Sequence, residues 1–111
     1  MSTTILHVRI TTRTAPGAFL AGATESARAI AALPGLIWKV WLQDEAAAEL
    51  GGVYLFASRA QAQAYLDGPI VAHLRQDPRV ARVEHRLWDT HALSALTGAP
   101  EAVPGAVREV A

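Results

Sequence analysis

A strongly apolar run over residues 36–42 constrains the fold of this chain more than any other feature. Side chains of a β-strand point alternately to its two faces. The first face would carry Leu36, Trp38, Val40 and Leu42, and the second Ile37, Lys39, Trp41 and Gln43. One set is wholly apolar and the other still contains two large apolar residues, whereas a strand with one wet face alternates more cleanly. The run predicts a strand covered on both faces, and in a chain of 111 residues a partner subunit is the simplest cover.

Composition indicates a single domain with a surplus of apolar surface. Ten basic residues balance ten acidic ones, so no charge pattern favours nucleic acid or a membrane as partner. Hydrophobic residues make up 51% and charged residues 18%, which favours oligomerisation or an apolar pocket. The lack of cysteine excludes disulfides and thiolate chemistry. Neither a secretory signal nor a membrane-spanning run is recognisable, so we expect a cytoplasmic protein.

The spacing of apolar and turn residues predicts a β-α-β-β-α-β order. Strands are expected over residues 5–12, 36–43, 53–57 and 80–88. A first helix is expected between the first two strands, where apolar residues from Phe19 to Leu33 recur at helical spacing. A second helix follows Ser58, whose spacing to Gln61 is that of a capping box, and Gly68-Pro69 divides it. A last short helix is expected over residues 90–96.

This order is typical of the ferredoxin-like split β-α-β fold, in the α+β class. Its helices cover one face of a four-stranded sheet. The other face would hold Trp38 or Trp41 with alternate residues of the third strand, which one depending on register. We expect a second copy to cover that face, giving a homodimer through the sheet faces. The domain is predicted to span residues 1–97, and residues 98–111 to form a C-terminal tail without assigned structure.

Three segments resemble the YdhR-like mono-oxygenases of the dimeric α/β-barrel superfamily. They are Gly35-Leu36-Ile37-Trp38-Lys39-Val40-Trp41, Gly51-Gly52-Val53-Tyr54-Leu55-Phe56 and Ala64-Tyr65-Leu66. The resemblance extends over residues 4–96. It implies a ferredoxin-like subunit whose sheet joins that of a second copy in a barrel, with an apolar pocket between sheet and helices. Members of this family are called mono-oxygenases largely by analogy with small cofactor-independent enzymes that oxidise polycyclic aromatic substrates.

Aromatic residues are the first candidates for a binding site. Rings prefer offset or tilted packing on other rings, so several aromatic side chains could line a flat pocket for a small aromatic molecule. The alternative is that they fill the core and the subunit interface. The predicted substrate-binding set is Trp38, Trp41, Tyr65, Trp88 and, as a polar member, His7.

Proton-handling residues are the second group of candidates. His73 is expected on the short helix after Pro69, a region from which haem-degrading relatives take a histidine, so it is the predicted base; a surface histidine is the alternative. Tyr54 and Arg9 are predicted as catalytic donors to a phenolate. His7 and Arg9 share one strand face, and they could instead pair with Glu84 or with the other subunit. No metal-ligand spacing occurs, so neither a metal nor a cofactor is predicted.

The chain contains no asparagine. Haem-degrading relatives use an Asn-Trp-His set, and the quinone-forming mono-oxygenases use an asparagine beside Trp, Tyr and Arg, so neither set transfers intact. The preferred hypothesis is a cofactor-independent mono-oxygenase that acts on an aromatic or polycyclic phenolic substrate, whose anion reacts directly with oxygen. One alternative is a cyclase or isomerase acting on a polyketide-like compound. The other is a non-catalytic small-molecule-binding protein.

Overall fold

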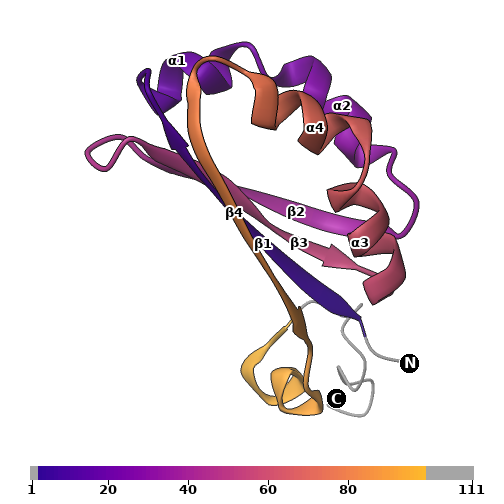
Figure 1. Cartoon of the computed structure of the whole chain (residues 1–111). Coiled ribbons are helices and arrows are strands. Elements are labelled where there is room, and N and C mark those ends of the chain that lie inside the picture. The colour runs from indigo at the N-terminus through magenta and orange to yellow at the C-terminus, as the bar shows by residue number, and fades with distance from the viewer. Residues whose placement is uncertain (1–2, 100–111) are drawn as a thin grey trace.

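A four-stranded antiparallel sheet with helices on one face forms the body of the protein (Figure 1). The computed structural model describes residues 3–99, so most of the predicted tail, residues 100–111, lies outside the described residues, as do residues 1–2. The elements are β1 (Thr4–Thr12), α1 (Pro16–Ala21), α2 (Thr24–Ala31), β2 (Leu36–Asp44), β3 (Glu49–Phe56), α3 (Arg59–Leu66), α4 (Pro69–Gln76), β4 (Val80–Asp89) and the 3-10 helix η1 (Ala92–Thr97). The strand order is β2-β3-β1-β4. None of the described helices is long and apolar enough to cross a membrane.

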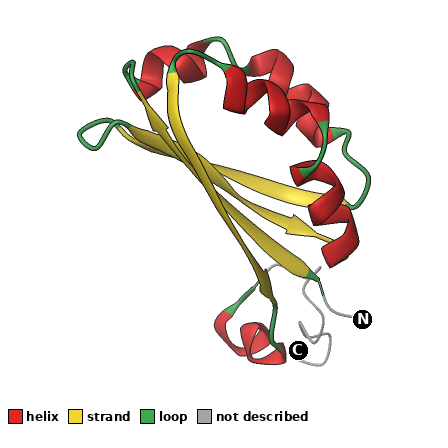
Figure 2. Ribbon diagram, in the orientation of Figure 1, coloured by secondary structure: helices red, strands yellow, loops and turns green. Residues whose placement is uncertain are grey.

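The predicted α+β, ferredoxin-like order is confirmed, with each crossover helix divided in two. The prediction of one continuous helix between the first two strands is wrong, because α1 ends at Ala21 and α2 starts at Thr24. Between them the N–H groups of Gly22 and Ala23 donate to carbonyls of the last turn of α1. A glycine in mid-helix is unfavourable by about 1 kcal/mol relative to alanine, which makes this the natural place for a break. Figure 2 shows all four helices on one side of the sheet and η1 apart from them.

The start of α3 agrees with the sequence prediction, and the start of β3 does not. The capping box is present: the Ser58 hydroxyl accepts a hydrogen bond from the Gln61 N–H at 3.2 Å and starts α3. The predicted start of the third strand is wrong, because β3 begins at Glu49 and contains Gly51-Gly52. The predicted strand left these glycines out, but both pair with β1 and β2 in the middle of the sheet. The hairpin turn lies earlier, over residues 45–48, where Ala48 has a φ of 55°.

A β-bulge in β2 changes the face on which its side chains lie. Leu36 pairs with Phe56 and Trp38 with the adjacent Leu55, so Ile37 is an extra residue in this strand. Leu36 therefore lies on the helix-covered face with Lys39 and Trp41. The prediction that Leu36 shares a face with Trp38 is wrong, because strict alternation fails at a bulge.

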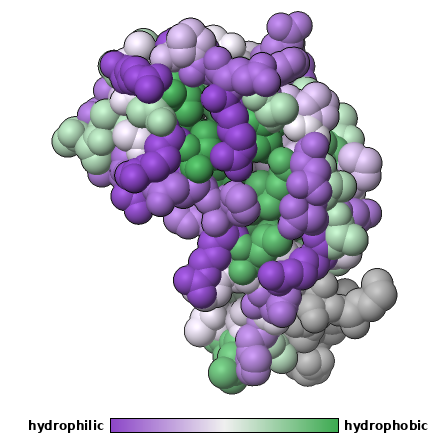
Figure 3. All heavy atoms as spheres, in the orientation of Figure 1, coloured by the Kyte–Doolittle hydropathy of each residue, from purple (hydrophilic) through white to green (hydrophobic). Residues whose placement is uncertain are grey.

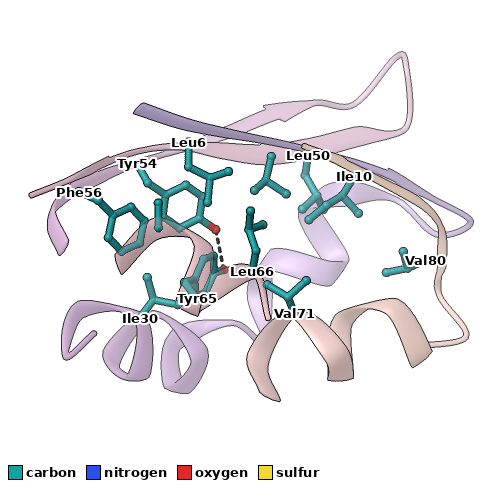
Figure 4. Close-up of a cluster of buried hydrophobic side chains, with 12 residues drawn as sticks. Leu6, Ile10, Ile30, Leu50, Tyr54, Phe56, Tyr65, Leu66, Val71 and Val80 are labelled. Atoms are coloured by element: carbon teal, nitrogen blue, oxygen red, sulfur yellow. Dashed lines mark hydrogen bonds between the residues drawn. The ribbon is translucent and has the colours of Figure 1, made fainter. Parts of the chain in front are cut away.

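The core lies between the sheet and the helices (Figure 4). Alternate residues of β1 and β3 point toward the helices, and Ile30, Tyr65, Leu66 and Val71 meet them from α2, α3 and α4. Leu6 and Phe56 are fully buried. Their burial contributes about 1.5–3 kcal/mol each to folding. This layer supports the wall of the cavity described below.

The helix-free face of the sheet is divided into an apolar and a charged half. Its apolar half comes from β2 and β3 and includes Val40 and Leu42, which are 51% and 38% exposed. Its charged half comes from β1 and β4 and carries Arg9, Arg82, Glu84 and Arg86. In the view of Figure 3, hydrophobic residues are visible between groups of strongly hydrophilic ones along the molecule. In the β2–β3 register Trp38 pairs with Leu55, which places Trp38 on the helix-free face, and Trp41 lies on the helix-covered face.

Candidate functional site

A cavity of about 190 Å³ lies between the helix-covered face of the sheet and the helices. Its walls are mainly apolar and aromatic, from every strand except β4 and from all four helices. The aromatic lining residues are Phe19, Trp41, Tyr54 and Tyr65, and the ionisable ones besides these tyrosines are Lys39, His73, Asp77 and Arg79. An apolar cavity with a few polar groups is typical of a small-molecule site. Residues 3–99 contain no cluster of His, Asp and Glu that would hold a metal ion.

Two tyrosine hydroxyls meet inside the cavity. The Tyr54 hydroxyl, from β3, lies 2.8 Å from the Tyr65 hydroxyl, from α3, and the pair is buried (Figure 4). Burial is the main cause that raises the pKa of both side chains, and for Tyr54 the neighbouring Tyr65 adds to it. Both phenols therefore stay protonated near neutral pH. One hydroxyl donates to the other, which leaves one O–H of the pair available to an oxygen atom of a ligand.

The amino group of Lys39 lies among aromatic rings in the same cavity. Its Nζ is 3.3 Å from the ring centroid of Trp41 and 4.4 Å from that of Tyr54. Such contacts stabilise an ammonium ion, but they do not replace the water that burial removes. Burial lowers the pKa of Lys39 from its ordinary value near 10.5 to about 7. The side chain is thus divided between its charged and neutral forms near neutral pH.

Lys39 is the functional candidate that the sequence analysis missed. It was assigned only to a strand face, although one signal was available: it is the sole lysine of the chain, against nine arginines. Arginine stays charged in proteins, whereas a buried lysine changes its pKa readily. The chain therefore carries its one readily titrated amine side chain inside the cavity.

The rim of the cavity carries a paired arginine and the predicted histidine. Arg79 donates two hydrogen bonds to the Asp77 carboxylate, at 3.0 and 2.7 Å, and its guanidinium lies 4.3 Å from the Phe19 ring centroid. These bonds lower the pKa of Asp77 to about 2. His73 is exposed in the last turn of α4 and lines the same cavity. The rim pair is electrically balanced, so the uncompensated basic groups of the lining are Lys39 and His73.

The structure brings four of the eight predicted site residues together. His73, Tyr54, Trp41 and Tyr65 line the cavity. The other four, which are Arg9, His7, Trp38 and Trp88, lie on the helix-free face. Within one subunit they cannot contact a molecule held in the cavity, because the sheet lies between.

The four residues on the helix-free face have other neighbours. Arg9 forms an ion pair with Glu49 at 2.8 Å and lies beside Glu84 in the ladder, the partner considered for it from the sequence. His7 lies opposite Arg86, whose guanidinium is 3.8 Å from the Trp88 ring centroid. The Trp38 Nε1 group is buried and has no hydrogen-bond partner among the described residues.

The fold and the cavity define a ferredoxin-like α+β domain with a mainly apolar cavity between its two layers. The chain belongs to the family described as "Putative mono-oxygenase ydhR", which matches residues 5–100. No protein with a curated description matches it.

Solved structures with the same fold include proteins of known and unknown activity. A protein of unknown function from Nitrosomonas europaea is 27% identical, with a TM-score of 0.64 over 81% of this chain and 90% of its own. SnoaB from Streptomyces nogalater, a cofactor-independent oxygenase, is 17% identical, with a TM-score of 0.65 over 82% and 95%. The heme-degrader MhuD from Mycobacterium tuberculosis is 17% identical, with a TM-score of 0.59 over 78% and 94%. The family match confirms the resemblance to a mono-oxygenase family, and the solved structures confirm the ferredoxin-like α+β fold class.

Proposed function

We propose that this protein is a cofactor-independent mono-oxygenase that oxidises a small phenolic aromatic molecule in the cavity. The observation that carries the proposal is the pair of protonated hydroxyls of Tyr54 and Tyr65 inside an aromatic cavity. Membership of a mono-oxygenase family supports it, as does the likeness in fold to a cofactor-independent oxygenase.

The substrate supplies the electrons in this reaction. A phenol or enol loses its proton, and the electron-rich anion reacts with O₂. For an anthrone-type substrate, one CH₂ group and O₂ become one C=O group and water, so no external reductant is needed. The cavity contributes preorganised donors: the Tyr54–Tyr65 pair gives an O–H to the substrate oxygen on which charge develops.

The remaining lining residues have roles that follow from their position. The Trp41 indole gives a flat surface on which a substrate ring stacks. His73 is exposed at the rim, where it exchanges a proton between the cavity and solvent. An apolar cavity of about 150 Å³ binds benzene, so a cavity of about 190 Å³ has room for at least one or two rings of a bound substrate in each subunit.

We also propose that two copies associate through the helix-free face. Val40, Leu42 and Trp88 are large apolar residues exposed on it, and a symmetric contact would bury them in both copies. The buried Nε1 of Trp38 lacks a partner among residues 3–99, and a neighbouring subunit is one source of an acceptor. Arg9, His7 and Trp88 are assigned to this contact and not to catalysis in the cavity.

Oxygen consumption tests the proposed reaction. Wild type should consume O₂ with one or more members of a panel of anthrones and naphthols. His73→Ala should reduce turnover by about 100-fold, the lower end of the usual range for losing a proton-transfer group. Arg75→Ala is the matched control, since Arg75 is exposed on the same helix and does not line the cavity.

The alternatives give different results in the same assay. Turnover under nitrogen would identify a cyclase or isomerase. Saturable binding without any product would identify a binding protein. Equal turnover by wild type and His73→Ala would remove His73 from the mechanism but leave the mono-oxygenase reaction standing.

A further inference from the structure

We propose that Lys39 accepts the proton of the substrate and then holds the resulting anion, so that the cavity selects aromatic molecules bearing an acidic oxygen. The reaction it serves rests on the proposed function, but the selectivity does not. A ligand with a carboxylate or an ionised phenol should therefore bind better than its neutral counterpart, whether or not it is oxidised.

The first argument is that Lys39 has no acidic partner. The ion pairs among residues 3–99 are Arg9–Glu49, Arg59–Asp89, Arg79–Asp77 and Arg82–Glu84, and none includes Lys39. Its amino group instead contacts the ring faces of Trp41 and Tyr54. Lys39 is partly buried, and a charge withdrawn from water without a counter-ion is unfavourable. A ligand that brings an anion to this amine therefore gains an interaction that the free protein lacks.

The second argument concerns the other charged groups that face the cavity. The Asp77 carboxylate accepts three hydrogen bonds from Arg79, including one from its N–H, so it is not available to Lys39. From α3 the cavity receives the Tyr65 hydroxyl, and from α4 it receives His73 at the rim. Neither α1 nor α2 contributes an ionisable side chain to the lining. An anion bound in the cavity therefore has Lys39 as the lining cation without an acidic partner, with His73 only at the exposed rim.

The third argument is chemical. An ordinary lysine is protonated at neutral pH and cannot accept a proton, but burial lowers the pKa of Lys39 to about 7. A substantial fraction of this amine is thus neutral. The O–H bond of a bound phenol breaks, an N–H bond forms on Nζ, and the ammonium and phenolate remain as an ion pair. Tyr54 and Tyr65 are protonated and cannot take this role, although they can donate to the same phenolate.

Calorimetric titration of two nearly isosteric probes tests the inference without turnover. These are 2-naphthoate, which is anionic, and 2-naphthamide, which is neutral. At pH 8, wild type should bind 2-naphthoate about tenfold or more tighter, as expected for one charge-assisted hydrogen bond. Titration in two buffers of different ionisation enthalpy should show uptake of close to one proton with 2-naphthoate and none with 2-naphthamide.

Variants assign the effect to Lys39. Lys39→Met should bind both probes equally and take up no proton. Lys39→Arg should keep the preference for 2-naphthoate and lose the proton uptake, because a guanidinium is already charged. Arg28→Met is the matched control: it also removes one positive charge, but from the exposed surface of α2, and it should behave as wild type.

The wild-type protein also provides a direct readout. Reductive methylation with ¹³C-formaldehyde labels the sole lysine and the N-terminal amine, so the Lys39 signal can be titrated by NMR. Its pKa should rise when 2-naphthoate binds. Equal affinity for the two probes, or no change in that pKa, would overturn the inference. If O₂ consumption is absent but the preference and proton uptake are present, the mono-oxygenase proposal fails and the anion site stands.

Discussion

Lys39 occupies the space that a side chain at Gly52 would fill. A Cβ built on Gly52 would lie 2.5 Å from the Lys39 Cε and 3.3 Å from the Tyr54 ring. Gly52 pairs with Trp41 across the β2–β3 ladder. The Lys39 side chain therefore lies over Gly52, which has no side chain of its own. The glycine therefore leaves room for the Lys39 amino group beside the rings of Trp41 and Tyr54.

Gly52→Ala should displace Lys39 toward solvent. The lysine chain is flexible and can move, so we expect a destabilisation of only about 1–2 kcal/mol, as for a modest overpacking. The pKa of Lys39 should rise toward its ordinary value as the amine regains water. Denaturant unfolding and the NMR titration of the methylated amine measure both effects.

Gly51→Ala is the comparison for this change. A Cβ on Gly51 would collide with the backbone carbonyl oxygen of Val8, which cannot move without breaking the ladder. It should be clearly more destabilising than Gly52→Ala. Equal effects of the two substitutions would contradict the account of Gly52.

The two buried hydroxyls should behave as a coupled pair. Tyr65→Phe leaves the Tyr54 hydroxyl without its partner, which should lower the free energy of unfolding by about 1–3 kcal/mol. Tyr54→Phe should have a similar effect. The double variant removes both polar atoms, so its effect should be smaller than the sum of the single effects. Urea unfolding of the four proteins completes the cycle, and strictly additive values would disprove the coupling.

Stability should rise with pH because of Lys39. The folded protein holds this amine with a pKa of about 7, whereas an unfolded lysine keeps its proton up to about 10.4. Between these values the unfolded state binds more protons, so the free energy of unfolding increases with pH, by at most about 1.4 kcal/mol per pH unit. Below about pH 6 both states are charged and the slope disappears.

The variant Lys39→Met isolates this contribution. The difference in unfolding free energy between wild type and variant, measured from pH 6 to 9.5, should shift in favour of wild type as pH rises. This range stops short of tyrosine ionisation in the unfolded chain. A difference that does not change with pH would show that the amine keeps an ordinary pKa.

Val40→Glu should weaken the proposed homodimer. It places a charge in the middle of the apolar half of the helix-free face, where a symmetric contact would bury two copies of it. Sedimentation velocity at micromolar concentration should show a dimer for wild type and mainly monomer for the variant. Ala29→Glu, on the exposed surface of α2, should remain dimeric. A well-folded wild-type monomer at this concentration would refute the homodimer.

Sequence patterns predicted the four strands, the helices between them and the Ser58 cap, because each depends on local spacing. They did not predict the faces of β2, because the extra residue Ile37 shifts the register and no residue type is diagnostic of such a bulge. They also failed at Gly51-Gly52, since glycines that relieve crowding in a strand resemble those of a turn.

The residues that line the cavity could be predicted only in part from the sequence. Aromatic residues and a histidine can be recognised as candidates in a sequence, so His73, Tyr54, Tyr65 and Trp41 were predicted, and all four line the cavity. A lysine normally indicates an exposed position, and Lys39 is informative because it is partly buried, which lowers its pKa. Arg9 and His7 were correctly grouped with each other, but the strand pairing that separates them from the cavity depends on the register.

The bulge at Ile37 sets which face of the sheet each later side chain of β2 points to. Removing or adding one residue near Ile37 would exchange the outward positions of Trp38 and Val40 with the inward positions of Lys39 and Trp41. Length variation at this point would then alter the cavity lining and the helix-free face in one step. Directed evolution of new specificities should therefore substitute side chains here and keep the number of residues fixed.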